Sequence, residues 1–314
     1  MANIRYTLAI CTHNHADHLR ETLRGLRPLQ APDGGWELLI IDNHSSDETP
    51  AILAQGDWHL PGIPNRVVRE ERLGVANARN RAVLEAQGEY IVFLDDDETP
   101  EPDWLRAMER HINAYAPDAV GGPYRVMFEG APRPPWLQDE LLPFLGALDH
   151  GPHPMALTQE TTPFWTGNSA FRKATLLEHG LFDPDLGRRG GNRAGGEDTE
   201  MYRRLLARGC KLRWAPDAVI HHRIRANKLS RRFFLDLHFE QGKLQGSQQR
   251  GDGSRFPPAW VLGHLAKAAA RAIAKRLREG RQHSLRTDMN TAYFAGFTLG
   301  WAFGPRTLQT CGEA

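Results

Sequence analysis

The feature that most constrains the fold is an apolar run that leads directly into a cluster of acidic residues. Residues 90–94 read Tyr-Ile-Val-Phe-Leu, and Asp95, Asp96, Asp97 and Glu98 follow at once. Such a short, β-prone run is typical of a strand buried on both faces of a sheet. Ligands of open α/β sheets bind beyond the carboxyl ends of the strands. Because clustered carboxylates repel one another without a cation, the cluster predicts a divalent-metal platform, although alone it equally fits a solvated turn that opens a helix.

The bulk composition limits the class of protein. A chain of 314 residues favours one large domain with an appendage, and its 39 basic and 38 acidic residues give no argument for nucleic acid. Three cysteines lie far apart without metal-ligand spacing, which suits a reducing compartment. No signal peptide and no apolar run of about 20 residues is visible, so we expect a cytoplasmic protein.

The first third of the chain alternates strand and helix patterns. Strands are expected at residues 6–11, 36–41 and 66–69, with helices at about 16–26 and from Gly74 to Gln87. Such alternation predicts a parallel sheet covered on both faces. Three strands would then deliver Thr12, Asp42 and Asp95–Asp97 to one edge, as a site of nucleotide size.

The middle of the chain is less regular. A helix at about 103–115, a strand at 119–128, an irregular insertion at 129–160 and a strand at 166–172 are expected. The glycine-rich stretch 187–196 precedes a helix that begins at Glu197. Its three arginines suit either a lid over a diphosphate or a plain surface connection. Short strands are expected at 211–214 and 218–222.

Three helices are expected at the C-terminal end, at residues 229–249, 259–278 and 285–303. In the middle one, an apolar stripe faces away from a basic stripe. The apolar members are Val261, Leu262, Leu265, Ala269, Ile273 and Leu277, and the basic members are Lys267, Arg271, Lys275 and Arg278. The last helix is too short to span a bilayer, and it could lie in a membrane surface or pack on the catalytic domain.

Six motifs in this order resemble the inverting family 2 glycosyltransferases of the GT-A fold. They are Ala9–Asn14, Ile41–Thr49, Gly74–Asn80, Phe93–Asp97, Gly195–Asp198 and Pro216–His222. One such motif would be weak, whereas six in sequence are specific. His13 stands where the family has another aromatic residue. The resemblance covers roughly residues 6–225.

The resemblance implies an α/β fold of the GT-A type, with a Rossmann-like, mostly parallel central sheet flanked by helices. It divides the chain into a catalytic domain at 1–225 and a helical C-terminal appendage at 226–314. Within the catalytic domain, 1–128 would be the nucleotide-sugar-binding half and 129–225 the acceptor half. The implied activity is a metal-dependent, inverting transfer from a nucleotide-diphosphate-sugar to a hydroxyl of a polysaccharide or lipid-linked glycan.

Residue roles follow from the same resemblance. The donor-binding residues would be Thr12, Asn14, Asp42, Gly74, Arg79, Asp95 and Asp96. Asp97, with Asp95 and His222, would hold Mn²⁺ or Mg²⁺. Asp198 would be the general base, with Glu197 as its substitute, although helix capping also explains this pair. Trp165, Gly167 and Asn168 would line the acceptor side.

Two other functions fit part of the pattern. Residues 94–99 also match the strand end of haloacid-dehalogenase-like phosphatases, in which Asp95 would accept a phosphoryl group. That fold usually places this strand first, whereas here about ninety residues precede it. A non-catalytic sugar-nucleotide-binding protein is the other alternative. For the transferase, we expect a location in the cytoplasm, peripheral on the inner face of the membrane.

Overall fold

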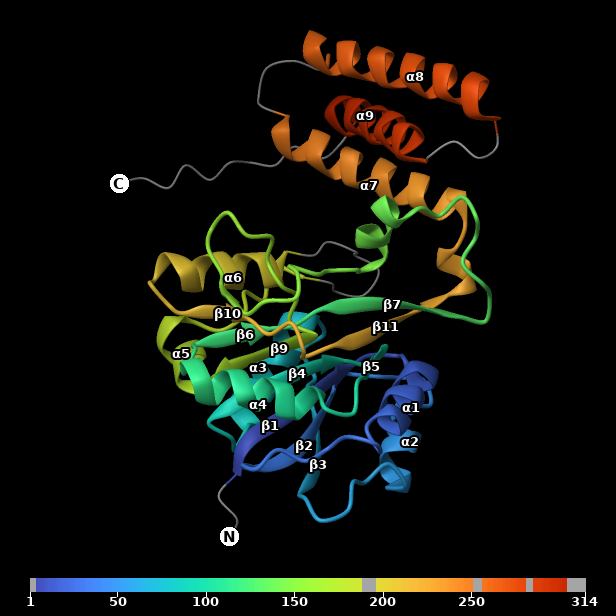
Figure 1. Cartoon of the computed structure of the whole chain (residues 1–314). Coiled ribbons are helices and arrows are strands. Elements are labelled where there is room, and N and C mark those ends of the chain that lie inside the picture. Colours follow the sequence, from blue (N-terminus) through green and yellow to red (C-terminus); the bar gives the residue numbers. More distant parts are fainter. Residues whose placement is uncertain (1–3, 188–195, 251–255, 281–284, 304–314) are drawn as a thin grey trace. The chain divides into compact units, whose positions relative to one another are not determined.

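The chain forms two compact units, joined by strands that belong to both. The computed structural model describes residues 4–187, 196–250, 256–280 and 285–303 (Figure 1). One unit comprises Met1–Met127 and Gly146–Arg223, and the other comprises Phe128–Leu145 and Ile224–Ala314. The chain passes between them within β7 (Tyr124–Glu129), again between Leu145 and Gly146, and a third time within β11 (Ile220–Arg225). Two of these three crossings are therefore made by extended backbone.

The first unit is built on an eight-stranded sheet with the strand order β3-β2-β1-β4-β9-β6-β10-β8. The strands are β1 (Ile4–Thr12), β2 (Gly35–Asp42), β3 (Asn65–Arg69), β4 (Tyr90–Asp95), β6 (Ala119–Gly121), β8 (Met155–Ala156), β9 (Asn168–Arg172) and β10 (Leu212–Trp214). The first four strands pair in parallel, while β9 runs antiparallel to both β4 and β6. The predicted mostly parallel α/β sheet is confirmed.

Helices cover this sheet because its central strands are apolar on both faces. They are α1 (Ala16–Gly25), α2 (Thr49–Gln55), α3 (Val75–Glu85), α4 (Trp104–Tyr115), α5 (Lys173–His179) and α6 (Glu197–Ala207). Leu8 and Ile10 of β1, Leu39 of β2 and Val92 of β4 are completely buried. Burying such side chains stabilises the fold by roughly 1.5–3 kcal/mol each, which holds these strand ends in fixed register.

One prediction about the middle of the chain was wrong. The single strand expected at 119–128 is two strands, β6 and β7, because Pro123 lacks a backbone N–H and Gly122 lies against the Ala218 carbonyl with no room for a side chain. The acidic cluster does not adopt the alternative of a turn that opens a helix, and the helix expected at about 103–115 is α4. Glu98–Pro100 instead form β5, and α4 begins only at Trp104. A second small sheet has the order β5-β11-β7.

The second unit is mainly helical. It contains α7 (Arg231–Gln249), α8 (Ala259–Glu279) and α9 (Arg286–Phe303), with the short 3₁₀ helices η1 (Asp139–Leu145) and η2 (Ala226–Lys228). Trp136 and Phe144 pack edge-to-face on Phe234 and His238 of α7. The insertion at 128–145 therefore contributes apolar contacts to this unit.

A glycine contact joins α7 and α9. It consists of Gly242 and Gly246 on α7 and Gly296 and Gly300 on α9. A Cβ atom at any of the four positions would overlap a backbone carbonyl of the other helix. The two backbones therefore touch directly, as small residues on facing helices allow. No helix in the described ranges is long and apolar enough to cross a membrane.

Helix α8 buries only part of its apolar surface. Val261, Ala268 and Ala272 are buried. By contrast, 48% of Leu262, 60% of Ile273 and 82% of Leu277 remain exposed. The predicted apolar stripe therefore splits, with Val261 facing inward and the larger residues Leu262, Ile273 and Leu277 facing outward.

Candidate active site

Parallel pairing aligns the polar ends of three strands at one edge of the sheet. Thr12 of β1 lies opposite Asp42 of β2, and Cys11 lies opposite Asp95 of β4. Asp42 is buried, and its Oδ1 accepts a hydrogen bond from the backbone N–H of Ser45 at 3.0 Å. The structure thus brings Thr12, Asp42 and Asp95 to a common edge, as the strand pattern predicted.

A buried arginine links this edge to the start of α6. The Arg79 guanidinium, from α3, is only 5% exposed. Its Nη2 donates to Asp95 Oδ1 at 3.3 Å, while its Nη1 donates to Glu197 Oε1 at 2.9 Å and Asp198 Oδ1 at 2.6 Å. One cation therefore serves three carboxylates, and the local charge stays negative.

The two acidic residues of α6 are not equivalent. Glu197 Oε2 is buried and has no hydrogen-bond partner among the described residues. Asp198 keeps 18% of its side chain exposed. Both of its contacts fall on Oδ1, since Thr166 Oγ1 also donates to that oxygen at 2.5 Å. In the described part of the chain, Asp198 Oδ2 therefore remains available for another proton donor.

Crowding of the carboxylates perturbs their protonation. Desolvation, together with the charges of Asp97, Asp198 and Asp96, raises the pKa of Asp95 to about 6, against the opposing effect of Arg79. Desolvation and the Asp95 charge hold the pKa of Glu98 well above its usual value. These shifts mark a place where a further positive charge would be stabilising.

Asp96 and Asp97 face different partners. Asp96 Oδ2 accepts a hydrogen bond from Thr12 Oγ1 at 2.6 Å, and its Oδ1 lies 3.0 Å from His15 Nδ1. Asp97 Oδ2 lies 3.3 Å from Nε2 of His222. The three consecutive aspartates are thus distributed over three separate contacts.

Asp97 and His222 are the pair best suited to hold a metal ion. His222 lies on β11 opposite Glu98 of β5, in the antiparallel register that brings it to the acidic strand end. A side chain at Gly146 would collide with its imidazole. In the described residues, no three His, Cys, Asp or Glu side chains already form a metal-binding group. An aspartate oxygen and an imidazole nitrogen 3.3 Å apart are donors of the kind that a divalent cation accepts.

The remaining predicted donor residues shape the loops beside this edge. Asn14 adopts a left-handed conformation with φ 52°, and its Oδ1 accepts the backbone N–H of Ser46 at 2.7 Å and of Asp47 at 3.2 Å. Gly74 has φ 137° at the start of α3 and donates to Asn43 Oδ1 at 2.8 Å. These contacts fix the two loops without using Asp42.

The residues predicted to line the acceptor side are closely packed beside the acidic strand end. Trp165 contacts Tyr124 edge-to-face at 5.0 Å. A Cβ atom at Gly167 would collide with the carboxylates of Asp95 and Glu98. Asn168 is fully buried, and its side chain bonds Trp104 Nε1 and the carbonyls of Pro123 and Ala218. In the described structure Asn168 therefore positions the segment through internal bonds.

Comparison with known proteins agrees with this geometry. The family model described as "Glycosyl transferase family 2" matches residues 7–180. The chain belongs to glycosyl transferase family 2. It is 25% identical over 300 residues to the "Succinoglycan biosynthesis protein ExoM" of Rhizobium meliloti (strain 1021), covering 92% of this chain and 91% of that protein. Membership in this transferase family leaves the phosphatase alternative without support.

Solved structures share the transferase fold. One is the "Mannosyltransferase PcManGT from Pyrobaculum calidifontis in complex with GDP-Man and Mn2+", with a TM-score of 0.62 and 19% identity over 95% of this chain and 87% of that one. Another is GalNAc-T7 with UDP, GalNAc and Mn²⁺, with a TM-score of 0.54 and 17% identity over 80% of this chain and 52% of that one. The fold of this family 2 transferase is therefore GT-A, with a helical C-terminal region.

Sequence reasoning about this transferase missed two residues that contact the predicted site. Thr166 bonds Asp198, and His15 contacts Asp96. Thr166 lies between Trp165 and Gly167, which were both predicted to line the acceptor side, so its place in the sequence could have indicated that it belongs to the site. For His15, the sequence shows only that it follows the first strand. The possible lid at 187–196 falls largely on residues 188–195, which lie outside the described residues.

Proposed function

We propose that this chain is a metal-dependent, inverting glycosyltransferase that uses a nucleotide-diphosphate-sugar as donor and a glycan hydroxyl as acceptor. The observation that carries the proposal is the bridge from Asp95 through Arg79 to Asp198. It places a strand-end carboxylate of the expected donor side and a candidate base within reach of one guanidinium. Donor and acceptor chemistry could therefore occur at the same sheet edge.

Asp198 is the proposed general base. Because Arg79 and Thr166 both bond Oδ1, the side chain is oriented and Oδ2 can accept the proton of the acceptor hydroxyl. Glu197 is less suited, since its unpaired oxygen is buried. A single base is sufficient for inversion, in which the acceptor oxygen attacks the anomeric carbon as the bond to the diphosphate breaks.

Asp97, His222 and Asp95 are the proposed ligands of the divalent cation. Two solved structures of similar fold hold Mn²⁺ with a nucleotide or nucleotide sugar, which supports a divalent cation here. When bound, the cation would neutralise the leaving diphosphate. A mixed set of imidazole and carboxylate favours Mn²⁺, and Mg²⁺ remains compatible with it. Asp42, Thr12, Asn14, Gly74 and Asp96 would surround the nucleoside.

The test is a panel of nucleotide sugars, each assayed with and without Mn²⁺ for thermal stabilisation and for metal-dependent release of the nucleotide diphosphate. We expect one sugar nucleotide to stabilise the protein and to be turned over. Asp97→Asn should lose metal-dependent binding. Asp198→Asn should keep binding and lower kcat by roughly 10²–10⁴-fold. If Asp198→Asn keeps full turnover while Asp97→Asn loses binding, Asp198 is not the base.

We further propose a growing polysaccharide or lipid-linked glycan as acceptor, reached from the cytoplasmic face of a membrane. The similarity to a succinoglycan biosynthesis protein supports the polysaccharide. The exposed Leu262, Ile273 and Leu277 of α8 form an apolar face suited to a bilayer surface. This proposal is independent of the donor assay.

Flotation with vesicles tests the membrane contact. A truncation before α8 would also remove α9 and uncover the glycines of α7, so point substitutions are the cleaner choice. Ile273→Glu with Leu277→Glu should release the protein from vesicles. Leu84→Glu is the control, since Leu84, on α3 of the first unit, is 56% exposed against 60% for Ile273. Equal recovery of all variants with the vesicles would exclude this contact.

A further inference from the structure

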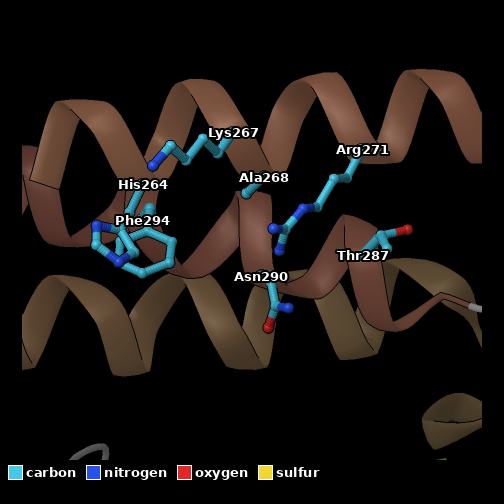
Figure 2. Close-up of a pocket in the computed structure, with 7 residues that line it drawn as sticks. All are labelled: His264, Lys267, Ala268, Arg271, Thr287, Asn290 and Phe294. Atoms are coloured by element: carbon cyan, nitrogen blue, oxygen red, sulfur yellow. The ribbon is translucent and has the colours of Figure 1, made fainter.

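A small cavity that opens to solvent lies between helices α8 and α9 of the second unit. Its volume is about 270 Å³. The lining residues are His264, Lys267, Ala268 and Arg271 of α8 and Thr287, Asn290 and Phe294 of α9. Figure 2 shows Lys267 and Arg271 extending from α8 on either side of Ala268, with Asn290 on the facing helix. The small side chain of Ala268 leaves the space between the two cations open.

Among the residues that the structure describes, no carboxylate pairs with either of the two cations of this cavity. Lys267 and Arg271 are four residues apart on one helix, an arrangement in which like charges repel. The acidic residue of α8, Glu279, lies 4.0 Å from Lys275, and Asp288 of α9 lies 3.1 Å from Arg276. Within the described ranges no ion pair reaches Lys267 or Arg271. The cavity is therefore a positive site without its anion.

The other side chains give the cavity a defined shape. His264 Nδ1 bonds the Trp260 carbonyl at 2.7 Å, and the imidazole lies 5.3 Å from the Phe294 ring. These contacts make one fixed wall. Asn290 is exposed on the facing helix, where its amide can donate a hydrogen bond. The cavity thus combines two positive charges with a neutral donor.

We propose that this cavity binds a phosphate group. A lysine ammonium acts as a point charge, and an arginine fork donates two parallel hydrogen bonds, so together they suit a tetrahedral anion with several oxygens. The phosphate could be free or carried by a lipid head group. At about 100° per residue, Ile273 lies about 120–160° around α8 from Lys267 and Arg271, and Leu277 lies about 80–120° from them, so the site adjoins the exposed apolar face of α8 without coinciding with it.

Two probes test the site with the full chain: inorganic phosphate, followed by calorimetry, and phosphatidylcholine vesicles with or without phosphatidic acid, followed by flotation. Lys267→Gln with Arg271→Gln should weaken binding by about tenfold or more. Lys275→Gln with Arg278→Gln removes the same charge outside the cavity and should weaken binding less than about threefold.

A third variant distinguishes binding inside the cavity from attraction to the overall positive charge of α8. Asn290→Asp barely changes the shape but supplies a carboxylate to the cations, so it should abolish binding of inorganic phosphate and the gain in flotation that phosphatidic acid gives over phosphatidylcholine alone. Circular dichroism should show that it folds. Calorimetric binding of inorganic phosphate without a gain in flotation from phosphatidic acid indicates a free-phosphate site, and a gain in flotation without calorimetric binding of inorganic phosphate indicates a lipid head group. Equal losses in the two double variants, retained binding by Asn290→Asp, or no binding of either probe would overturn the proposal. Donor turnover does not depend on this site, so it should be unchanged.

Discussion

The two units of the chain carry opposite charge imbalances at their candidate sites. In the first unit, Arg79 is shared by Asp95, Glu197 and Asp198, and further carboxylates lie beside it. In the second unit, Lys267 and Arg271 have no carboxylate between them within the described residues. The first site is therefore short of a cation, and the second is short of an anion.

This difference indicates what each unit can bind. Clustered carboxylates with a nearby imidazole suit a divalent metal and its phosphate ligands, whereas unpaired cations suit the phosphate directly. The two units could thus both bind phosphate groups, the first through a metal ion and the second through cationic side chains. The two arrangements also differ in burial, since Arg79 is 5% exposed and Lys267 and Arg271 are solvent-exposed.

The largest expected effect comes from removing the shared cation of the first unit. Arg79→Met should lower the free energy of unfolding by about 3–5 kcal/mol, because the buried Glu197 carboxylate loses its partner. Urea denaturation measures this loss. Arg72→Met is the control, since Arg72 pairs with Glu70 while 70% of its side chain is exposed. Equal stability of the two variants would show that Arg79 is not essential to the acidic network.

A smaller effect is expected at the glycine contact that holds the second unit together. Gly300→Ala should destabilise the protein by about 1–3 kcal/mol, because the methyl group would overlap the Lys243 carbonyl. Gly263→Ala on α8 meets open space and should instead stabilise by up to about 1 kcal/mol. Thermal unfolding of both variants checks the signs. Stabilisation by Gly300→Ala would mean that the two backbones do not touch.

Thr166 offers a finer test of the first site. Thr166→Val removes the hydrogen bond to Asp198 Oδ1 and should lower kcat by about tenfold, with little change in KM. Thr166→Ser keeps the hydroxyl and should restore most of the activity. A change in KM with kcat unchanged, or no recovery of activity in Thr166→Ser, would show that Thr166 does not position Asp198.

The reactivity of a thiol in each unit can be used to compare the electrostatic environments of the acidic site and the cationic cavity. Burial, together with the charges of Asp95 and Asp96 and against the opposing effect of Arg79, raises the pKa of Cys11 to about 12. Cys11 should therefore resist alkylation at pH 8, since only the thiolate reacts. A thiol introduced by Asn290→Cys would line the same cavity as two cations, and its alkylation should rise with pH at a midpoint below about 8.5. Peptide mass spectrometry follows both sites, and equal midpoints would refute the difference in field.

Much of this architecture could be predicted from local sequence. The apolar run at 90–94 and the polar residues after it predicted β4 and its acidic end, because a buried strand needs such a run whatever its surroundings. The spacing of the first strands placed Thr12, Asp42 and Asp95 at one edge, which the register confirms. Helix boundaries at the C-terminal end were also close to those observed.

The rest depends on contacts between distant residues. Nothing near Arg79 in the sequence shows that it meets Asp198, more than one hundred residues later. The different partners of Asp96 and Asp97 are Thr12, His15 and His222, which come from other strands and loops. Likewise, the periodicity of α8 did not show which apolar residues face α9. Only the pairing of the two helices decides that.

The glycine contact between α7 and α9 has a consequence for synthesis of the protein on the ribosome. Glycine is a poor helix former, so each helix carries two residues that weaken it in isolation. Helix α7 leaves the ribosome well before α9, with all of α8 between them. The nascent α7 is therefore without its partner helix until α9 has been synthesised. A chaperone that shields α7 during that interval would increase the yield of folded protein.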